Sequence, residues 1–137
     1  MLDKIPFVDL HKQYISIKNE IDNAISSVIN TSSFVRGPFV DDFESSFADL
    51  MERDHCISCA NGTDALYISM IALGIRRDDE VIVPSHSWIS TSETVTQASG
   101  RVVFCDTNED THTIAVAQIE SKITNKTVGI IPVHLYG

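Results

Sequence analysis

Short continuous apolar runs alternate with helical stretches from about residue 55 onward, and this alternation limits the folds open to the chain. Continuous apolar strands separated by helices are typical of a parallel sheet covered on both faces, with right-handed crossovers between strands. The sequence therefore predicts an α/β fold with a mostly parallel sheet and helices on both faces. The predicted strands span residues 56–59, 80–84, 102–105 and 127–133; the predicted helices span residues 63–73 and 87–99, which stop at Gly74 and Gly100, and a further helix carries Val116, Ile119 and Ile123.

Two helices are predicted ahead of this region. Apolar residues recur every three or four positions between Leu10 and Ile29, which predicts an amphipathic helix with one buried stripe. A stretch rich in Ser, Gly and Pro over residues 31–38 breaks the pattern, and Pro38 suits the first turn of a second helix that carries Phe43 and Phe47.

Length and charge exclude several classes of protein. The chain has 137 residues, which suits one domain, and its net charge of −9 argues against a nucleic-acid partner. A phosphorylated small molecule stays compatible with that charge, because backbone N–H groups at a helix start can bind phosphate locally. Apolar runs are too short to cross a membrane and the first residues do not resemble a secretory signal, so we expect a cytoplasmic protein without a membrane partner.

The junction around Gly62 is a candidate anion site. Asn61 and Gly62 form a turn signal after a predicted strand, and Thr63 opens the next helix. Such a junction directs unpaired N–H groups and the positive end of the helix dipole at one point. The alternative is a plain turn with Thr63 as a helix cap. Neither common nucleotide-binding glycine motif is present, which disfavours a Rossmann-type domain.

Trp88, the single tryptophan, follows the predicted strand at residues 80–84. Ligands of open α/β sheets bind beyond the carboxyl ends of strands, so Trp88 lies where a flat ligand could stack; the alternative is a core residue. Asp106, His134 and Tyr136 also follow predicted strands, and Asp106 could equally be a turn residue. His86 receives no role.

The three cysteines do not indicate a metal site or a redox site. Cys56 and Cys59 are three positions apart within an apolar run, and Cys105 is the only further cysteine, which is too few ligands for structural zinc. We expect all three to be buried and inert, with no metal bound.

Further segments of the chain are typical of one known family: residues 5–10, Gly37 with Phe43 and Glu44, residues 61–66, residues 79–84, residues 87–91 and residues 132–137. Taken in order, these segments resemble the DegT/DnrJ/EryC1/StrS family of sugar aminotransferases. That family uses pyridoxal 5′-phosphate and has the fold-type I aspartate aminotransferase architecture. The resemblance implies that residues 1–137 are the N-terminal part of the large, cofactor-binding domain, without the rest of that domain or the small C-terminal domain.

The resemblance also implies roles for individual residues. Gly62, Thr63 and Asp64 would bind the cofactor phosphate mainly through backbone N–H groups, with the Thr63 hydroxyl as a further donor and the Asp64 carboxylate turned away. Trp88 would stack on the pyridine ring. Thr91 and Asp106 would help to line the pocket. Arg36 would meet the phosphates of a nucleotide sugar, unless it is simply an exposed, solubilising side chain.

The implied activity is transfer of an amino group from glutamate to a nucleotide-linked keto-deoxyhexose. The segment around Trp88 is most similar to members that act on dTDP-3-keto-6-deoxyhexoses, with 4-keto sugars left open. The Schiff-base Lys and the Asp that pairs with the pyridinium nitrogen lie beyond Gly137 in the family, and none of the lysines present matches a catalytic position: Lys4, Lys12, Lys18, Lys122 and Lys126.

We therefore expect residues 1–137 to be inactive on their own. We expect the full-length protein to form a homodimer. The alternative is a truncated remnant or module that only binds phosphate ligands or another chain. An open sheet edge should also make the chain marginally stable.

Overall fold

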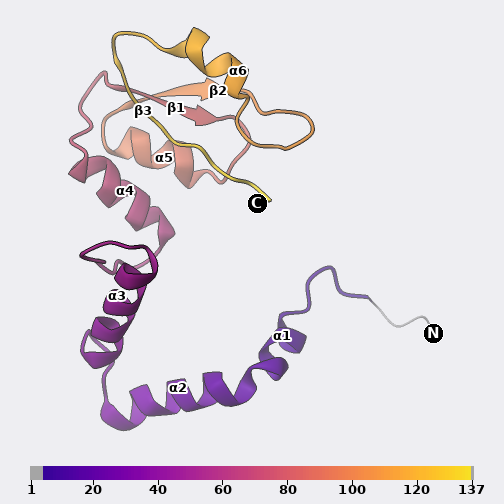
Figure 1. Ribbon diagram of the computed structural model, residues 1–137, viewed down its shortest axis with the longest axis vertical. Coiled ribbons are helices and arrows are strands. Elements are labelled where there is room, and N and C mark those ends of the chain that lie inside the picture. The colour runs from indigo at the N-terminus through magenta and orange to yellow at the C-terminus, as the bar shows by residue number, and fades with distance from the viewer. Residues whose placement is uncertain (1–4, 137) are drawn as a thin grey trace. The chain divides into compact units, whose positions relative to one another are not determined.

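The computed structural model describes residues 5–136, so Lys4 and Gly137 lie outside the described residues. The chain divides into two compact units with the boundary after Ser58. The first unit contains α1 (Leu10–Ser16), α2 (Lys18–Thr31) and α3 (Pro38–Leu50) (Figure 1). The second contains α4 (Gly62–Ala72), β1 (Glu80–Pro84), α5 (Ser90–Gln97), β2 (Arg101–Cys105), α6 (Val116–Ile119), a 3-10 turn (Glu120–Lys122) and β3 (Thr127–Ile130).

The single helix predicted over residues 10–29 is wrong, because the helix breaks at Ile17. Ser16 Oγ donates to the Gln13 carbonyl at 2.7 Å, and Ile17 N–H turns to the Tyr14 carbonyl, so local bonds replace the regular helical pattern there. The buried stripe is also wrong, since neither α1 nor α2 has a buried residue in this structure. Apolar periodicity identifies which helix face could be buried, but burial also requires another element to pack against that face.

The second helix predicted ahead of the sheet region is confirmed, and it is α3. Pro38 occupies the first turn of α3, as predicted, because its missing N–H would have no helical partner there. After α3, Ser58 N–H donates to Glu44 Oε1 at 2.7 Å and ties the following segment back to the helix. This hydrogen bond, with a smaller contribution from the charge of Arg36, holds the pKa of Glu44 below its usual 4.5.

The second unit is built on a parallel three-stranded sheet with the order β2-β1-β3. All five residues of the central strand β1 are buried. Val81 and Val83 pack on one face with Met70 of α4 and Val95 of α5, and Ile82 packs on the other face with a second set of residues, Cys105, Ile114 and Ile119. Helices α5 and α6 accordingly lie on opposite sides of the sheet (Figure 1).

The predicted strand at residues 56–59 is wrong, because no strand forms there in the described chain. An apolar run favours an extended backbone, but a strand also needs a neighbouring strand to pair with. The predicted strand at 127–133 shortens to β3, and the helix predicted from residue 87 begins only at Ser90. The other strands and α4 agree with the prediction within one residue or two, and α4 ends before Gly74, whose φ is +75°.

No helix within residues 5–136 has the length and apolar content that crossing a membrane requires.

Candidate functional site

A hollow of about 450 Å³ lies in the second unit, between the start of α4 and the turn that joins β1 to α5. Four of the residues predicted from the sequence line it: Gly62, Thr63, Trp88 and Thr91. Asn61, Leu66 and Ser90 complete the lining. The structure therefore brings together two segments that lie far apart in the sequence, at the carboxyl end of the central strand.

The first turn of α4 leaves two backbone donors free. Asn61 caps the helix, because its Oδ1 accepts the Asp64 N–H at 2.9 Å, and its carbonyl accepts the Ala65 N–H at 3.0 Å. Gly62 and Thr63 N–H groups have no acceptor within the described part of the chain. The positive end of the α4 dipole lies at the same point, so this turn can bind an anion.

Asp64 differs from its neighbours in this turn. Its N–H is already bound by Asn61, and its Oδ2 accepts a hydrogen bond from Asn61 Nδ2 at 3.0 Å. Asp64 is also not among the residues that line the hollow. The carboxylate is thus occupied by the capping residue, and a direct N–H contribution from Asp64 would require the cap to open.

Two pairs of hydroxyl groups flank the hollow. Thr63 Oγ1 lies 2.7 Å from Ser90 Oγ, and Ser87 Oγ lies 2.7 Å from Thr91 Oγ1. Ser90 is 4% exposed and Thr91 is 6% exposed, so both are held inside the fold. The first pair connects the start of α4 to the start of α5.

Trp88 is 76% exposed, so it is not a core residue of this chain. β1 ends at Pro84, and residues 85–89 form the turn that carries Trp88 to the wall of the hollow before α5 begins. A large aromatic surface left open beside free N–H donors is an unfavourable arrangement for a structural residue and a suitable one for holding a flat ligand.

Other predicted site residues lie outside this hollow. Asp106 is exposed and its Oδ1 accepts the Thr107 N–H at 2.8 Å, which is a local turn bond. His134 and His86 are exposed, and the Tyr136 ring packs edge-on against His112 with 5.8 Å between ring centres. None of these lines the hollow.

Arg36 belongs to the first unit, in the loop that precedes α3. Its φ of +53° places it in the left-handed region, directly before Gly37 at φ +102°. Its side chain is exposed.

The cysteines are not uniformly buried, so that part of the sequence prediction is wrong. Cys105 is buried, Cys56 is half-buried and Cys59 is exposed, with its Sγ 3.4 Å from the Asn61 carbonyl. Within residues 5–136 no three His, Cys, Asp or Glu side chains gather as metal ligands would.

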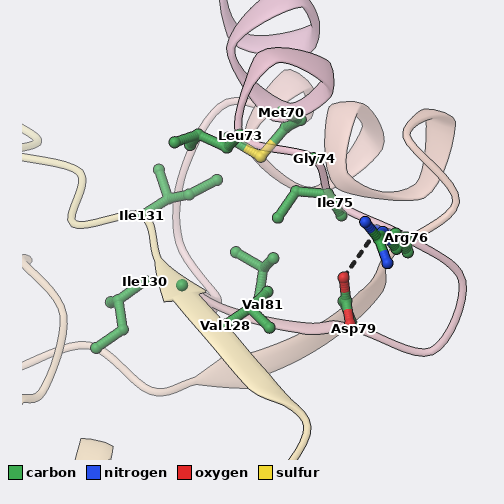
Figure 2. Close-up of a pocket in the computed structure, with 11 residues that line it drawn as sticks. Met70, Leu73, Gly74, Ile75, Arg76, Asp79, Val81, Val128, Ile130 and Ile131 are labelled. Carbon is green, nitrogen blue, oxygen red and sulfur yellow. Dashed lines mark hydrogen bonds between the residues drawn. The ribbon is translucent and has the colours of Figure 1, made fainter.

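A separate apolar hollow of about 380 Å³ lies between the end of α4 and the edge strand β3 (Figure 2). Met70, Val81 and Ile131 contribute apolar surface to it, and the loop before β1 closes through Arg76 N–H, which donates to Asp79 Oδ2 at 2.8 Å. It contains none of the site residues predicted from the sequence.

Sequence reasoning missed Asn61 and Ser90 as site residues. Both belong to motifs that it identified, but Asn61 was interpreted only as a turn residue. An Asn three positions before an acidic residue at a helix start is a recognisable capping pattern, and it could have identified Asn61. No local signal distinguishes Ser90 from the neighbouring hydroxyl residues, because its partner is 27 positions away.

The curated proteins similar to this chain include several sugar aminotransferases. Over 133 residues the chain is 41% identical to the UDP-2-acetamido-2-deoxy-3-oxo-D-glucuronate aminotransferase of Pseudomonas aeruginosa, a match that covers 97% of this chain and 37% of that protein. Over 134 residues it is 37% identical to the dTDP-3-amino-3,4,6-trideoxy-alpha-D-glucose transaminase of Streptomyces venezuelae, covering 98% and 35%. The chain spans about a third of the length of the curated relatives it matches.

Solved structures with the same fold include members of this group of enzymes. The crystal structure of S. venezuelae DesV matches with a TM-score of 0.90 and 37% identity, covering 98% of this chain and 36% of that one. The ntda protein of Bacillus subtilis with bound cofactor PMP matches with a TM-score of 0.90 and 33% identity, covering 100% and 32%. These matches confirm the predicted α/β fold of a pyridoxal-phosphate-dependent transferase, of which this chain spans a part.

Residues 15–137 also match the model of one family as a whole. With this match and the identities of its relatives, the chain belongs to the DegT/DnrJ/EryC1/StrS aminotransferase family.

Proposed function

We propose that this chain supplies the phosphate-binding turn and the ring-stacking side chain of a pyridoxal 5′-phosphate site in a nucleotide-sugar aminotransferase. One observation carries the proposal: the free N–H groups of Gly62 and Thr63 and the exposed indole of Trp88 line a single hollow. The phosphate requires donors and the pyridine ring requires a flat apolar surface, and the hollow offers both side by side.

The residues present fit the cofactor. The hollow, at about 450 Å³, is within the size range of small-molecule sites. An added Cβ at Gly62 would meet no atom within 4 Å, so the protein leaves space in front of this backbone. The Asn61–Asp64 hydrogen bond occupies the Asp64 carboxylate, which limits its repulsion of a phosphate dianion.

Each residue has a stated task in this proposal. Gly62 and Thr63 donate backbone N–H groups to the phosphate, Thr63 adds its hydroxyl, and Thr91 lines the wall beside it. Trp88 fixes the plane of the ring and excludes water from one of its faces. The bound cofactor supplies an electron sink for the bonds made and broken at the amino group.

The proposed reaction of the whole protein is amino transfer from glutamate to a keto-deoxyhexose carried by a nucleotide. The relative from S. venezuelae is a dTDP-sugar transaminase, and so is a 38% identical relative from Aneurinibacillus thermoaerophilus, which supports a dTDP-3-keto-6-deoxyhexose as substrate. Arg36 is proposed to meet the nucleotide phosphates. Its substitution by Ala should weaken binding of dTDP by the whole protein and leave cofactor binding unchanged; equal dTDP affinity would remove this role.

We propose that residues 1–137 alone do not transfer an amino group. No lysine lines the hollow in the described part of the chain, so a side chain able to form the Schiff base and move protons is missing from it. The test is turnover of glutamate with the cofactor and a dTDP-keto sugar present. Turnover by the purified chain would contradict the proposal, whereas binding without turnover also fits the alternative of a non-catalytic phosphate-binding module.

Self-association is the remaining part of the proposal. Phe43 and Phe47 of α3 are exposed and stack with 5.6 Å between ring centres, and α2 exposes Ile25 and Ile29. Apolar side chains displayed on successive helix turns support a homodimer of the full-length protein. Sedimentation of that protein should show a dimer, and a monomer at micromolar concentration would contradict it.

The fluorescence of Trp88 reports ligand binding, because Trp88 is the only tryptophan in the sequence. Titration with pyridoxamine 5′-phosphate, which cannot react with surface lysines, should quench its fluorescence saturably, and inorganic phosphate should compete. The absence of saturable quenching would refute the proposed cofactor site in this chain.

A further inference from the structure

Ser90 is the buried partner of the Thr63 hydroxyl. It is the first residue of α5, is 4% exposed, and places its Oγ 2.7 Å from Thr63 Oγ1. Neither hydroxyl has another hydrogen-bond partner within residues 5–136, and either oxygen can be the donor. The fold therefore leaves the direction of this hydrogen bond to be set by what binds in the hollow.

The direction decides what Thr63 presents to an anion. Each hydroxyl has one proton. If Thr63 donates to Ser90, its lone pairs are left for the hollow and repel a phosphate oxygen. If Ser90 donates to Thr63, the Thr63 proton is free to bind the phosphate, and the two hydrogen bonds in series strengthen each other.

We propose that Ser90 is a positioning residue for cofactor binding: it donates its proton to Thr63 Oγ1 so that Thr63 in turn donates to the cofactor phosphate. The inference rests on the proposed function, in which Thr63 contacts that phosphate. Ser90 belongs to α5, as Thr91 does, whereas the two free backbone N–H groups of the site come from α4. Because α4 and α5 pack against each other, the two oxygens keep their distance without a further contact.

The test is a double-mutant cycle read by Trp88 fluorescence with pyridoxamine 5′-phosphate. Ser90→Ala should weaken binding about threefold to tenfold, the net value of an ordinary hydrogen bond. Ser90→Cys, of similar size and with a weaker donor, should lose less. In a Thr63→Val background, Ser90→Ala should cause no further loss, because the oxygen it orients is gone.

Ser92→Ala is the matched control. Ser92 lies on the same helix, its Oγ donates to the Ile89 carbonyl at 3.1 Å, and it does not line the hollow. Its loss should leave the affinity unchanged.

Two results would overturn the inference alone: wild-type affinity in Ser90→Ala, or an equal loss from Ser90→Ala with and without the Thr63 hydroxyl, which would mean a merely structural role. If the wild-type chain does not bind the ligand, the proposed function fails and this inference fails with it.

Discussion

Replacing Gly100 by Ala tests how tightly α5 packs before the chain enters β2. An added Cβ would lie 2.8 Å from Ile75 Cγ2, 3.1 Å from Val95 Cγ1 and 3.2 Å from the Val95 carbonyl oxygen. Val95 is fully buried and Ile75 packs on the same cluster. Both side chains are β-branched and stiff, so the backbone must move to admit the methyl group.

We expect Gly100→Ala to lower the free energy of unfolding by about 1–3 kcal/mol, the usual cost of overpacking. Gly62→Ala is the control, because its Cβ would meet no atom within 4 Å and its φ is not positive. Alanine is also favoured over glycine in helices by up to about 1 kcal/mol, so Gly62→Ala should be neutral or slightly stabilising.

The assay is urea unfolding of the whole chain followed by far-UV circular dichroism. With a denaturant slope of about 1–3 kcal/mol per molar urea, the midpoint of Gly100→Ala should fall by roughly 1 M. A midpoint equal to that of the wild type would refute the packing argument. Equal destabilisation by Gly62→Ala would show that the loss has another cause.

Substitutions at Asn61, Glu44 and Trp88 test the cap of α4, the tie between α3 and Ser58, and the exposed indole. Asn61→Ala removes the cap of α4 and should cost about 0.5–2 kcal/mol in urea unfolding, while an unchanged midpoint would mean that the Asp64 N–H bond adds no stability. The pKa of Glu44, measured by NMR, should lie below 4.5, because the hydrogen bond from Ser58 N–H favours the charged carboxylate. This bond therefore stabilises the fold above pH 4.5, and the stabilisation is lost as the pH falls through the lowered pKa. The wild type should be more stable than Glu44→Gln at neutral pH but not in acid, and a stability difference that persists in acid would contradict this. Trp88→Ala should change the unfolding free energy by less than about 0.5 kcal/mol but weaken binding of pyridoxamine 5′-phosphate, measured by the ligand's own fluorescence; a large loss of stability would show a structural role.

Marginal stability, expected from the sequence, remains a prediction. Phe104 of β2 and Val128 and Ile130 of β3 are exposed on the outer strands of the sheet. Light scattering of the purified chain should show association, and a stable monodisperse monomer would contradict it.

The sequence predicted most of the sheet because local pattern is sufficient for a fully buried strand. Residues 81–83 form a continuous apolar run, and they become the centre of strand β1. Residues 56–59 have a similar local pattern but form no strand, since pairing depends on a neighbour elsewhere in the chain. The same limitation explains the unburied stripe of α2, which local periodicity could not detect.

For the candidate site, the sequence by itself determined the chemistry: a glycine and a threonine at a helix start, and an aromatic residue after a strand. Four of the predicted residues, Gly62, Thr63, Trp88 and Thr91, do line one hollow. Only the tertiary structure decided which hydroxyl faces Thr63. That hydroxyl belongs to Ser90, 27 positions away, and spacing along the chain does not encode the contact. Packing of α4 on α5, rather than local propensity, sets the 2.7 Å between the two hydroxyl oxygens.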